Sequence, residues 1–318
     1  MSKIVIIGAG FVGSTIAYAL MIGGTAQEIV LIDKIKEKAR GEAMDLNHGA
    51  SFVKPINIYA GDYSDCREAD IIIITAGVSQ RPGQTRLDLV ETNTAIMKEI
   101  ISRIMEYNTE AILIIVANPV DIISYVAWKS SDLPHSKVIG SGTVLDTSRF
   151  RHLLSVRCGI DPRNVHAYVI GEHGDSELPL WSTANIGGIP LERFCEDCTR
   201  ACSSHIREEV SQGVREAAYE IIEGKGATYY AIALAVRRIT ESILRDEHSV
   251  LTVSAYINNI YGIKDIYLSV PCILGKQGVE KIIPFKLDET EKKLFFQTAD
   301  IIKKSLPSDL LQPSLQLT

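Results

Sequence analysis

The chain has 318 residues, of which 46% are hydrophobic and 23% charged, and its net charge is −6. This composition is typical of a globular protein of one large or two ordinary domains, and the acidic balance argues against nucleic acid or anionic membranes as partners. No apolar run approaches the roughly 20 residues that span a bilayer. An expected strand begins within the first three residues, so the sequence predicts no signal peptide and a cytoplasmic protein.

The first expected strand covers residues 3–7, a β-branched run that is apolar on both faces, as in a buried parallel sheet. Gly8, Gly10 and Gly13 then give the spacing G-x-G-x-x-G before an apolar helix over residues 11–22. The first glycine allows a tight turn, the second lets a pyrophosphate approach the backbone, and the third lets helix and strand pack closely. The N–H groups and the dipole at the helix start favour an anion there.

A second expected strand, residues 28–32, ends in Asp33, which lies 20 residues after Gly13. An acid at this spacing would bind the hydroxyls of an adenosine ribose. Its charge favours NAD over NADP, because a carboxylate would repel a 2′-phosphate. A glycine-rich turn without a ligand is the alternative, but the strand, the helix and the acid together favour a dinucleotide.

Strands and helices continue to alternate after Asp33. A polar amphipathic helix is expected over residues 34–48, strands at 56–59 and 69–75, a helix at 87–107, and strands at 111–117 and 138–139. Six strands with intervening helices predict an α/β fold with a doubly wound parallel sheet of the Rossmann type. We expect a dinucleotide-binding domain over residues 1–140 and an α+β substrate domain over residues 141–318.

Small side chains end the strand at 69–75, which suits the approach of a flat ligand at the carboxyl edge of the sheet. The loop over residues 78–85 contains Pro82-Gly83 and could close as a lid. The predicted cofactor-binding residues are therefore Gly8, Gly10, Phe11, Val12, Gly13, Asp33, Thr75, Ala76 and Gly77.

The second half mixes helices and strands without repeats or low-complexity segments. Helices are expected over residues 144–158, 191–223, 228–245 and 289–305, with strands at 165–170, 180–185, 250–256 and 266–274.

Six cysteines in a chain of this length do not indicate a disulfide framework. Cys195, Cys198 and Cys202 have spacings that can bind a metal, with His205 nearby, and they share one face of an expected helix. No further Cys or His completes a site at ligand spacing. We interpret them as apolar thiols and expect no metal.

His173 stands in a glycine-flanked turn, residues 171–175, after an expected strand. Histidine exchanges protons near neutral pH, although a single histidine is more often structural than catalytic. Asp146 is a candidate partner, and Arg149, three residues further along a helix, faces the same side as Asp146. A local ion pair between these two is the alternative. Arg151 points the opposite way.

These motifs occur together in the order found in the lactate/malate dehydrogenase family. They are residues 8–13 with Asp33, residues 80–86, Asn118-Pro119, residues 145–151 and residues 171–175. On these motifs the chain resembles this family, and its bacterial L-lactate members in particular, over essentially its whole length. The resemblance implies an NAD-dependent oxidoreductase of glycolysis and fermentation that interconverts pyruvate and L-lactate, working as a homotetramer.

The resemblance also implies a role for each polar residue of the site. His173 would donate a proton to the substrate carbonyl oxygen as hydride arrives, and Asp146 would orient its imidazole. Arg149 would bind the substrate carboxylate bidentately. Arg86 would polarise the carbonyl group as a further catalytic residue, and Asn118 would hold substrate or nicotinamide.

Gln80 bears on the choice of substrate. Within the family an arginine at the matching position recognises the second carboxylate of oxaloacetate or malate, whereas a neutral amide leaves room for a methyl group. Thr228 would line the same pocket or cap a helix. Because Arg81 follows Gln80, malate dehydrogenase or another 2-hydroxyacid dehydrogenase remains the alternative. A catalytically silent dinucleotide sensor is disfavoured by the intact set of polar residues.

Arg151 and His166 match two residues that bind fructose 1,6-bisphosphate in the bacterial members that this sugar phosphate activates. Since Arg151 faces away from the catalytic side of its helix, an outward anion site is physically reasonable, with two solvent-exposed cations as the alternative. The resemblance therefore implies an allosteric enzyme.

Overall fold

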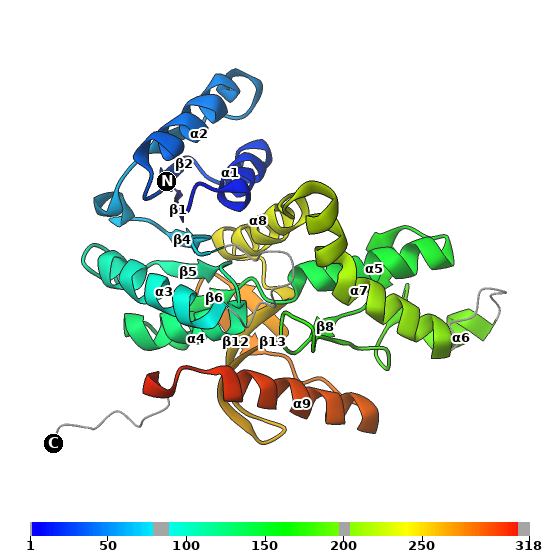
Figure 1. Ribbon diagram of the computed structural model, residues 1–318. Helices are drawn as coiled ribbons and strands as arrows, with labels where there is room; N and C mark the ends of the chain where they lie inside the picture. The colour runs from blue at the N-terminus through cyan, green and yellow to red at the C-terminus, as the bar shows by residue number, and fades with distance from the viewer. Residues whose placement is uncertain (1, 79–88, 197–203, 311–318) are drawn as a thin grey trace.

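The structure is a computed structural model that describes residues 2–78, 89–196 and 204–310 (Figure 1). Several residues that the sequence singles out lie outside the described residues: Gln80, Arg81, Arg86, Cys198 and Cys202. Within the described ranges, no helix is both long and apolar enough to cross a membrane.

Within the described residues, nine strands form one sheet in the order β14-β13-β12-β6-β5-β4-β1-β2-β3. The last six of these are parallel and have the order of a doubly wound dinucleotide-binding fold, which confirms the predicted α/β class. The strand order reverses between β1 and β4, where ligands of such folds bind at the carboxyl ends of the strands. The parallel strands are β1 (Lys3–Ile7), β2 (Glu28–Ile32), β3 (Asn57–Ala60), β4 (Ile71–Ile74), β5 (Ile112–Ile115) and β6 (Val138–Gly140).

Helices cover both faces of the parallel strands. They are α1 (Phe11–Gly23), α2 (Lys36–His48) and α8 (Tyr230–Leu244) on one face, with α3 (Val90–Met105) and much of α4 (Val120–Ser131) on the other. Ile4 and Ile6 of β1 belong to the first layer of core, and Val5 and Ile7 belong to the second. Successive side chains of a strand point to opposite faces, so both faces of β1 had to be apolar.

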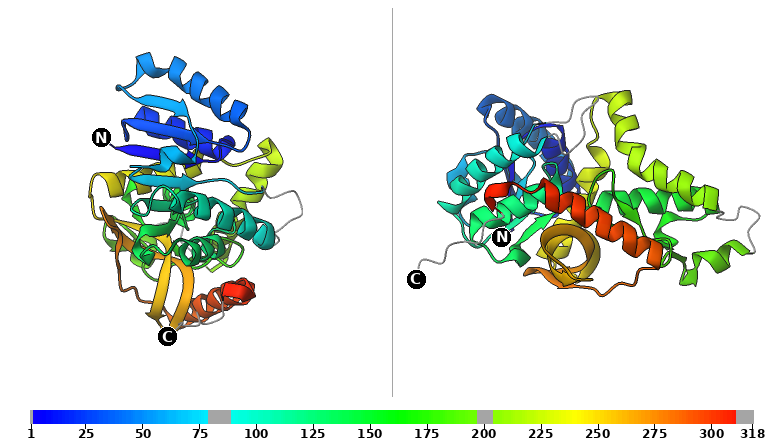
Figure 2. Two further views of the ribbon diagram at one scale, coloured as in Figure 1. Left: turned by 90° about the vertical axis from the view of Figure 1, so that its left-hand side faces the viewer. Right: turned by 60° about the horizontal axis from the view of Figure 1, so that its bottom comes forward.

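The second half of the chain extends the same sheet. The added strands are antiparallel: β12 (Ser249–Ile260), β13 (Ile263–Gly275) and β14 (Gly278–Ile282). Ser254 of β12 pairs with Gly140 of β6, so the sheet crosses the expected domain boundary. β12 and β13 continue beyond their predicted ranges, chiefly toward the turn that joins them, and form the long hairpin seen in Figure 2. The sequence analysis missed β14.

Three further helices pack around these strands: α5 (Val144–Cys158), α7 (Ser204–Lys225) and α9 (Glu289–Ser305). Phe150 of α5 and Val214 of α7 share a third core cluster, and α9 lies on the side of the molecule opposite α1 and α2 (Figure 1). In the range of the expected helix 191–223, the structure describes α6 (Leu191–Glu196) and α7. Cys195, in α6, is buried, as suits an apolar thiol.

Two predicted strands of the second half differ from the structure. The segment 165–170 forms two short strands, β7 (Val165–His166) and β8 (Val169–Ile170), because the chain leaves one small sheet and enters another. The segment 180–185 is mostly outside strands and lies between β9 (Leu178–Pro179) and β10 (Asn185–Ile186), which pairs with β11 (Ile189–Pro190).

Candidate active site

The glycine turn between β1 and α1 has the close contacts that its sequence predicts. A Cβ atom at Gly8, where φ is +107°, would lie 2.6 Å from Oγ1 of Thr75, and one at Gly13 would lie 1.8 Å from the carbonyl oxygen of Gly8. At Gly10, by contrast, the nearest atom is Nζ of Lys38 at 3.8 Å. Two glycines therefore pack the turn against β4 and α1, and the third leaves the backbone accessible to a ligand.

Asp33 follows β2 and lies beside this turn. Its Oδ2 accepts the N–H of Ala9 at 2.8 Å, and its Oδ1 accepts the N–H of Ile35 at 2.9 Å. Phe11, which begins α1, is exposed and stacks on Tyr229 with ring centroids 5.4 Å apart. Asp33, the residue expected to bind the ribose, thus lies beside the glycine turn expected to bind the pyrophosphate. The Phe11–Tyr229 pair connects this turn to the segment before α8.

Hydrogen bonds join the ends of β4 and β5. Asn93 of α3 accepts the N–H of Val78 through Oδ1 at 2.7 Å and donates through Nδ2 to the carbonyl oxygen of Asn118 at 2.6 Å. Oδ1 of Asn118 is buried and makes no hydrogen bond among the described residues. An unsatisfied buried acceptor is costly, so this atom fits a bound group that donates a hydrogen bond. Thr75, Ala76 and Gly77 line the adjacent end of β4.

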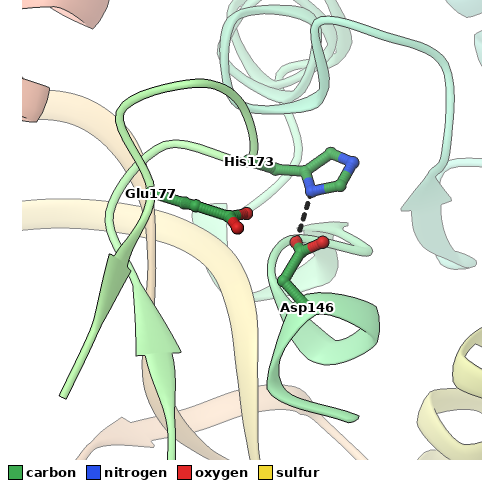
Figure 3. A group of neighbouring side chains, drawn as sticks. All are labelled: Asp146, His173 and Glu177. Carbon is green, nitrogen blue, oxygen red and sulfur yellow. Dashed lines mark hydrogen bonds and ion pairs between the residues drawn. The ribbon is translucent and has the colours of Figure 1, made fainter. Parts of the chain in front are cut away.

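His173 and Asp146 meet as the sequence predicts. Nδ1 of His173, in the turn after β8, lies 2.5 Å from Oδ2 of Asp146 in α5 (Figure 3). The Asp146 side chain is fully buried, and that of His173 is 12% exposed. A carboxylate at Nδ1 favours the tautomer that carries its proton there, so that Nε2 is the atom available for proton exchange.

The same carboxylate also pairs with Arg149. Nη1 of Arg149 donates to Oδ1 of Asp146 at 2.8 Å, so the local ion pair weighed as an alternative is present alongside the histidine contact. A guanidinium has five N–H donors, and the contact to Asp146 uses one nitrogen. Asp146 thus orients an imidazole and a cation with its two oxygens.

Glu177 is a buried acid that the sequence analysis missed. It comes from the same turn as His173 and points toward the His173–Asp146 pair, with possible ligand atoms of all three within 4.8 Å of one another (Figure 3). By residue type the three could hold a cation. Both oxygens of Asp146 already have partners, Arg149 on Oδ1 and His173 on Oδ2. The three side chains are therefore better suited to share a proton than to bind a metal ion.

Asp121, in the first turn of α4, is a second buried acid that the sequence analysis missed. Its Oδ2 accepts the backbone N–H of His173 at 2.8 Å, and its Oδ1 accepts the hydroxyl of Ser254 at 2.6 Å. Burial raises the pKa of Asp121 to about 7, against the opposing effect of these hydrogen bonds. The only sequence signal was a single acid in an otherwise apolar helical stretch.

Thr228 does not cap α8. The N-cap is Tyr229, without a side-chain capping hydrogen bond, and the helix begins at Tyr230. The capping alternative for Thr228 is therefore wrong, and Thr228 lies in the segment just before the helix.

Arg151 contacts a different part of the molecule from Arg149. Its Nε donates to the carbonyl oxygen of Ala167 at 3.0 Å, and its guanidinium lies over Tyr168, 5.4 Å from the ring centroid. Burial lowers the pKa of Arg151. His166, the residue before Ala167, is exposed on β7. Arg151 thus contacts the residue that follows His166.

Comparisons with known proteins agree with this geometry. Residues 2–140 match the NAD binding domain of lactate/malate dehydrogenases, and residues 143–310 match their alpha/beta C-terminal domain. The chain is 55% identical to an L-lactate dehydrogenase of Thermoanaerobacter sp. (strain X514), over 95% of this chain and 97% of the relative. It is 54% identical to the L-lactate dehydrogenase of Acetivibrio thermocellus, over 96% of each. A minor L-lactate dehydrogenase from Enterococcus mundtii, solved in a ligands-bound form, superposes with a TM-score of 0.92 at 44% identity and 98% coverage of each chain.

Proposed function

This chain belongs to the lactate/malate dehydrogenase family, and we propose that the site around His173 carries out the NADH-dependent, reversible reduction of pyruvate to L-lactate. The contact that supports this most directly is the bond from Nδ1 of His173 to Asp146, with Arg149 on the other oxygen of the same carboxylate. This arrangement places a proton donor next to a cation that can bind a carboxylate. Reduction of a 2-oxo acid requires both, one for its carbonyl oxygen and one for its carboxylate.

The glycine turn and the strand ends fit NAD. Gly10 leaves the backbone accessible for the pyrophosphate, Asp33 lies beside the turn for the ribose hydroxyls, and Oδ1 of Asn118 needs a donor such as a carboxamide N–H or a substrate hydroxyl. Bound NADH supplies the hydride. Phe11, Val12, Thr75, Ala76 and Gly77 would complete the contacts to the cofactor.

Each side chain then has one chemical task. Nε2 of His173 donates a proton to the carbonyl oxygen of pyruvate as the C–H bond forms, and it accepts that proton in the reverse reaction. Asp146 stabilises the imidazolium and keeps Nδ1 protonated. Arg149 binds the pyruvate carboxylate through the N–H groups that do not face Asp146. From the segment outside the described residues, Arg86 would stabilise charge on the carbonyl oxygen.

Pyruvate is the preferred substrate because Gln80 is neutral. A methyl group needs no counter-ion, whereas the second carboxylate of oxaloacetate would be buried without a cation. Thr228, just before α8, would lie on the same side of the pocket. The names of the relatives favour the lactate reaction over the malate alternative.

An assay of His173→Asn tests this proposal. We expect pyruvate-dependent oxidation of NADH to fall by a factor on the order of 10³ or more, because general acid catalysis contributes about this much. The NADH affinity, measured by fluorescence titration, should stay within about twofold because His173 does not hold the dinucleotide. Turnover equal to that of the wild type would contradict the proton-transfer role.

Four further expectations belong to the same proposal. They are a homotetramer, a cytoplasmic location, a division of the chain into residues 1–140 and 141–318, and activation by fructose 1,6-bisphosphate. The position of Arg151 beside Ala167, next to His166, supports the last of these, because a guanidinium and an imidazole on neighbouring segments suit a phosphate.

A further inference from the structure

Asp121 connects three segments of the chain behind the proposed active site. Its side chain is 1% exposed. One oxygen accepts the backbone N–H of His173 at 2.8 Å, and the other accepts the hydroxyls of Ser254 on β12 at 2.6 Å and of Ser269 on β13 at 3.4 Å. The backbone N–H of His173 can only donate, so the site requires an acceptor oxygen that faces it, whereas the two serine hydroxyls can donate or accept.

His173 is consequently held at two points by two acids from two helices. Asp146 of α5 binds the imidazole at Nδ1, and Asp121 of α4 binds the main chain of the same residue. The first contact sets the ring orientation and the tautomer. The second contact fixes the position of the His173 main chain, and therefore the position that Nε2 at the end of the side chain can take.

Asp121 also lies three residues after Asn118, in the first turn of α4. Asn118 directly precedes Pro119, the N-cap of α4, so the contact from Asp121 to the His173 main chain ties the turn that carries His173 to the segment after β5 that carries Asn118. We infer that Asp121 is a positioning residue that holds the His173 main chain at a fixed distance from the Asn118 end of the sheet. This inference rests on the proposed function, since it assigns Asp121 to the proton-transfer geometry of that reaction.

Opposing electrostatic effects act on Asp121. The start of α4 has a positive helix-dipole end, which favours negative charge in the first turn. Desolvation opposes the charge, and Glu172, the residue before His173, adds repulsion; together they raise the pKa of Asp121 to about 7. The protonated acid still accepts the His173 N–H through its carbonyl oxygen, so the positioning contact does not depend on the charge.

Two substitutions test the inference. Asp121→Ala removes the acceptor, and a displacement of about 1 Å at a proton donor costs roughly a hundredfold in rate. We expect kcat for pyruvate reduction to fall by about that factor, with the Kd for NADH within about twofold of the wild type. Asp121→Asn keeps an oxygen that accepts the His173 N–H, and it should recover at least about tenfold of the lost kcat.

Glu291 offers a matched control away from the site. It is a buried acid of α9, 5% exposed, and it likewise accepts a backbone N–H and a hydroxyl, both from Ser182, at 3.0 and 2.5 Å. Glu291→Ala should lower the melting temperature as Asp121→Ala does, but leave kcat close to that of the wild type. Comparison of Glu291→Ala with Asp121→Ala separates a general loss of stability from a displacement of His173.

The outcomes are decisive in each direction. The inference is supported if kcat falls strongly in Asp121→Ala but not in Glu291→Ala, if NADH binding stays intact, and if Asp121→Asn recovers part of the lost kcat. It is overturned if Asp121→Ala retains wild-type kcat, if Glu291→Ala loses kcat equally, or if Asp121→Asn is no better than Asp121→Ala. Should Asp121→Ala not fold, Asp121→Ser takes its place under the same criteria. A wild-type protein without pyruvate-dependent NADH oxidation would contradict the proposed function itself.

Discussion

Nδ1 of His173 and Oδ2 of Asp146 lie 2.5 Å apart, and the carboxylate in this contact has no solvent exposure. An imidazolium beside a buried carboxylate is stabilised, and the carboxylate holds the ring in the tautomer that presents Nε2 to the substrate. We expect Asp146→Asn to lower kcat by roughly 10²–10⁴-fold. Steady-state kinetics with saturating NADH measure this effect.

The same substitution should also weaken pyruvate binding, because Arg149 loses its ionic partner at 2.8 Å. The Kd for NADH, by contrast, should not change. A variant with normal kcat would show that His173 is oriented by other contacts.

Arg149→Lys should act mainly on substrate binding. A lysine ammonium cannot bind a carboxylate with two parallel N–H groups while it also contacts Asp146. We expect the KM for pyruvate to rise by at least about tenfold, equivalent to about 1.4 kcal/mol, which is within the strength of one charge-assisted hydrogen bond. An initial-rate series in pyruvate provides the measurement, and an unaltered KM would remove Arg149 from the carboxylate site.

Substrate preference should follow residue 80. Gln80→Arg introduces a cation that can pair with the second carboxylate of oxaloacetate and that lacks a partner beside the methyl group of pyruvate. The ratio of kcat/KM for oxaloacetate to that for pyruvate should rise by about a hundredfold or more. If the ratio stays constant, Gln80 does not line the pocket.

Arg151→Gln should remove activation by fructose 1,6-bisphosphate. We expect the effector to lower the pyruvate concentration for half-maximal rate in the wild type, and to have no effect in the variant. Arg157→Gln is a matched control, because this arginine lies on the same helix and pairs with Glu209. Equal activation in all three proteins would contradict the effector site.

The stability of the protein should depend on pH through Asp121. Its pKa rises from 3.8 to about 7 on folding, chiefly by burial. An acid with a raised pKa stabilises the fold below its unfolded value, and this contribution is lost as the pH rises through the folded value. The unfolding free energy of the wild type should therefore fall between about pH 4 and pH 7, relative to Asp121→Asn. Denaturant titrations across this range measure the difference, and a constant difference would argue against the shift.

Elements with a periodic pattern could be predicted from the sequence, and elements stabilised by distant contacts could not. β1, the glycine turn and α9 lie where the continuous β-branched run, the G-x-G-x-x-G spacing and the helical period place them. β14 has partly exposed polar residues and forms only because β13 provides a hydrogen-bonding edge. The segment 180–185 alternates apolar and polar side chains only in part: Ala184 is buried in the core cluster that Val214 of α7 also joins, whereas Ser182 and Thr183 are exposed, and most of the segment forms no ladder.

The residues of the candidate site likewise fall into those that the sequence could predict and those that it could not. Asp146, Arg149 and His173 belong to short motifs, so their types and spacings could be interpreted together. Asp121 and Glu177 are also acids within a few residues of a motif, but no motif spacing in the sequence links them to His173. The position of Asp121 depends on how α4 packs against β12, β13 and the His173 turn, which is a tertiary property.

The pairing of Gly140 with Ser254 predicts how the two halves of the chain behave when they are produced as separate fragments. Residues 1–140 expressed alone would end in β6 with an unsatisfied edge, and such edges promote aggregation. Fragments of residues 1–140 and 141–318 should therefore be recovered from cells as an associated pair when produced together, whereas the first fragment alone should precipitate.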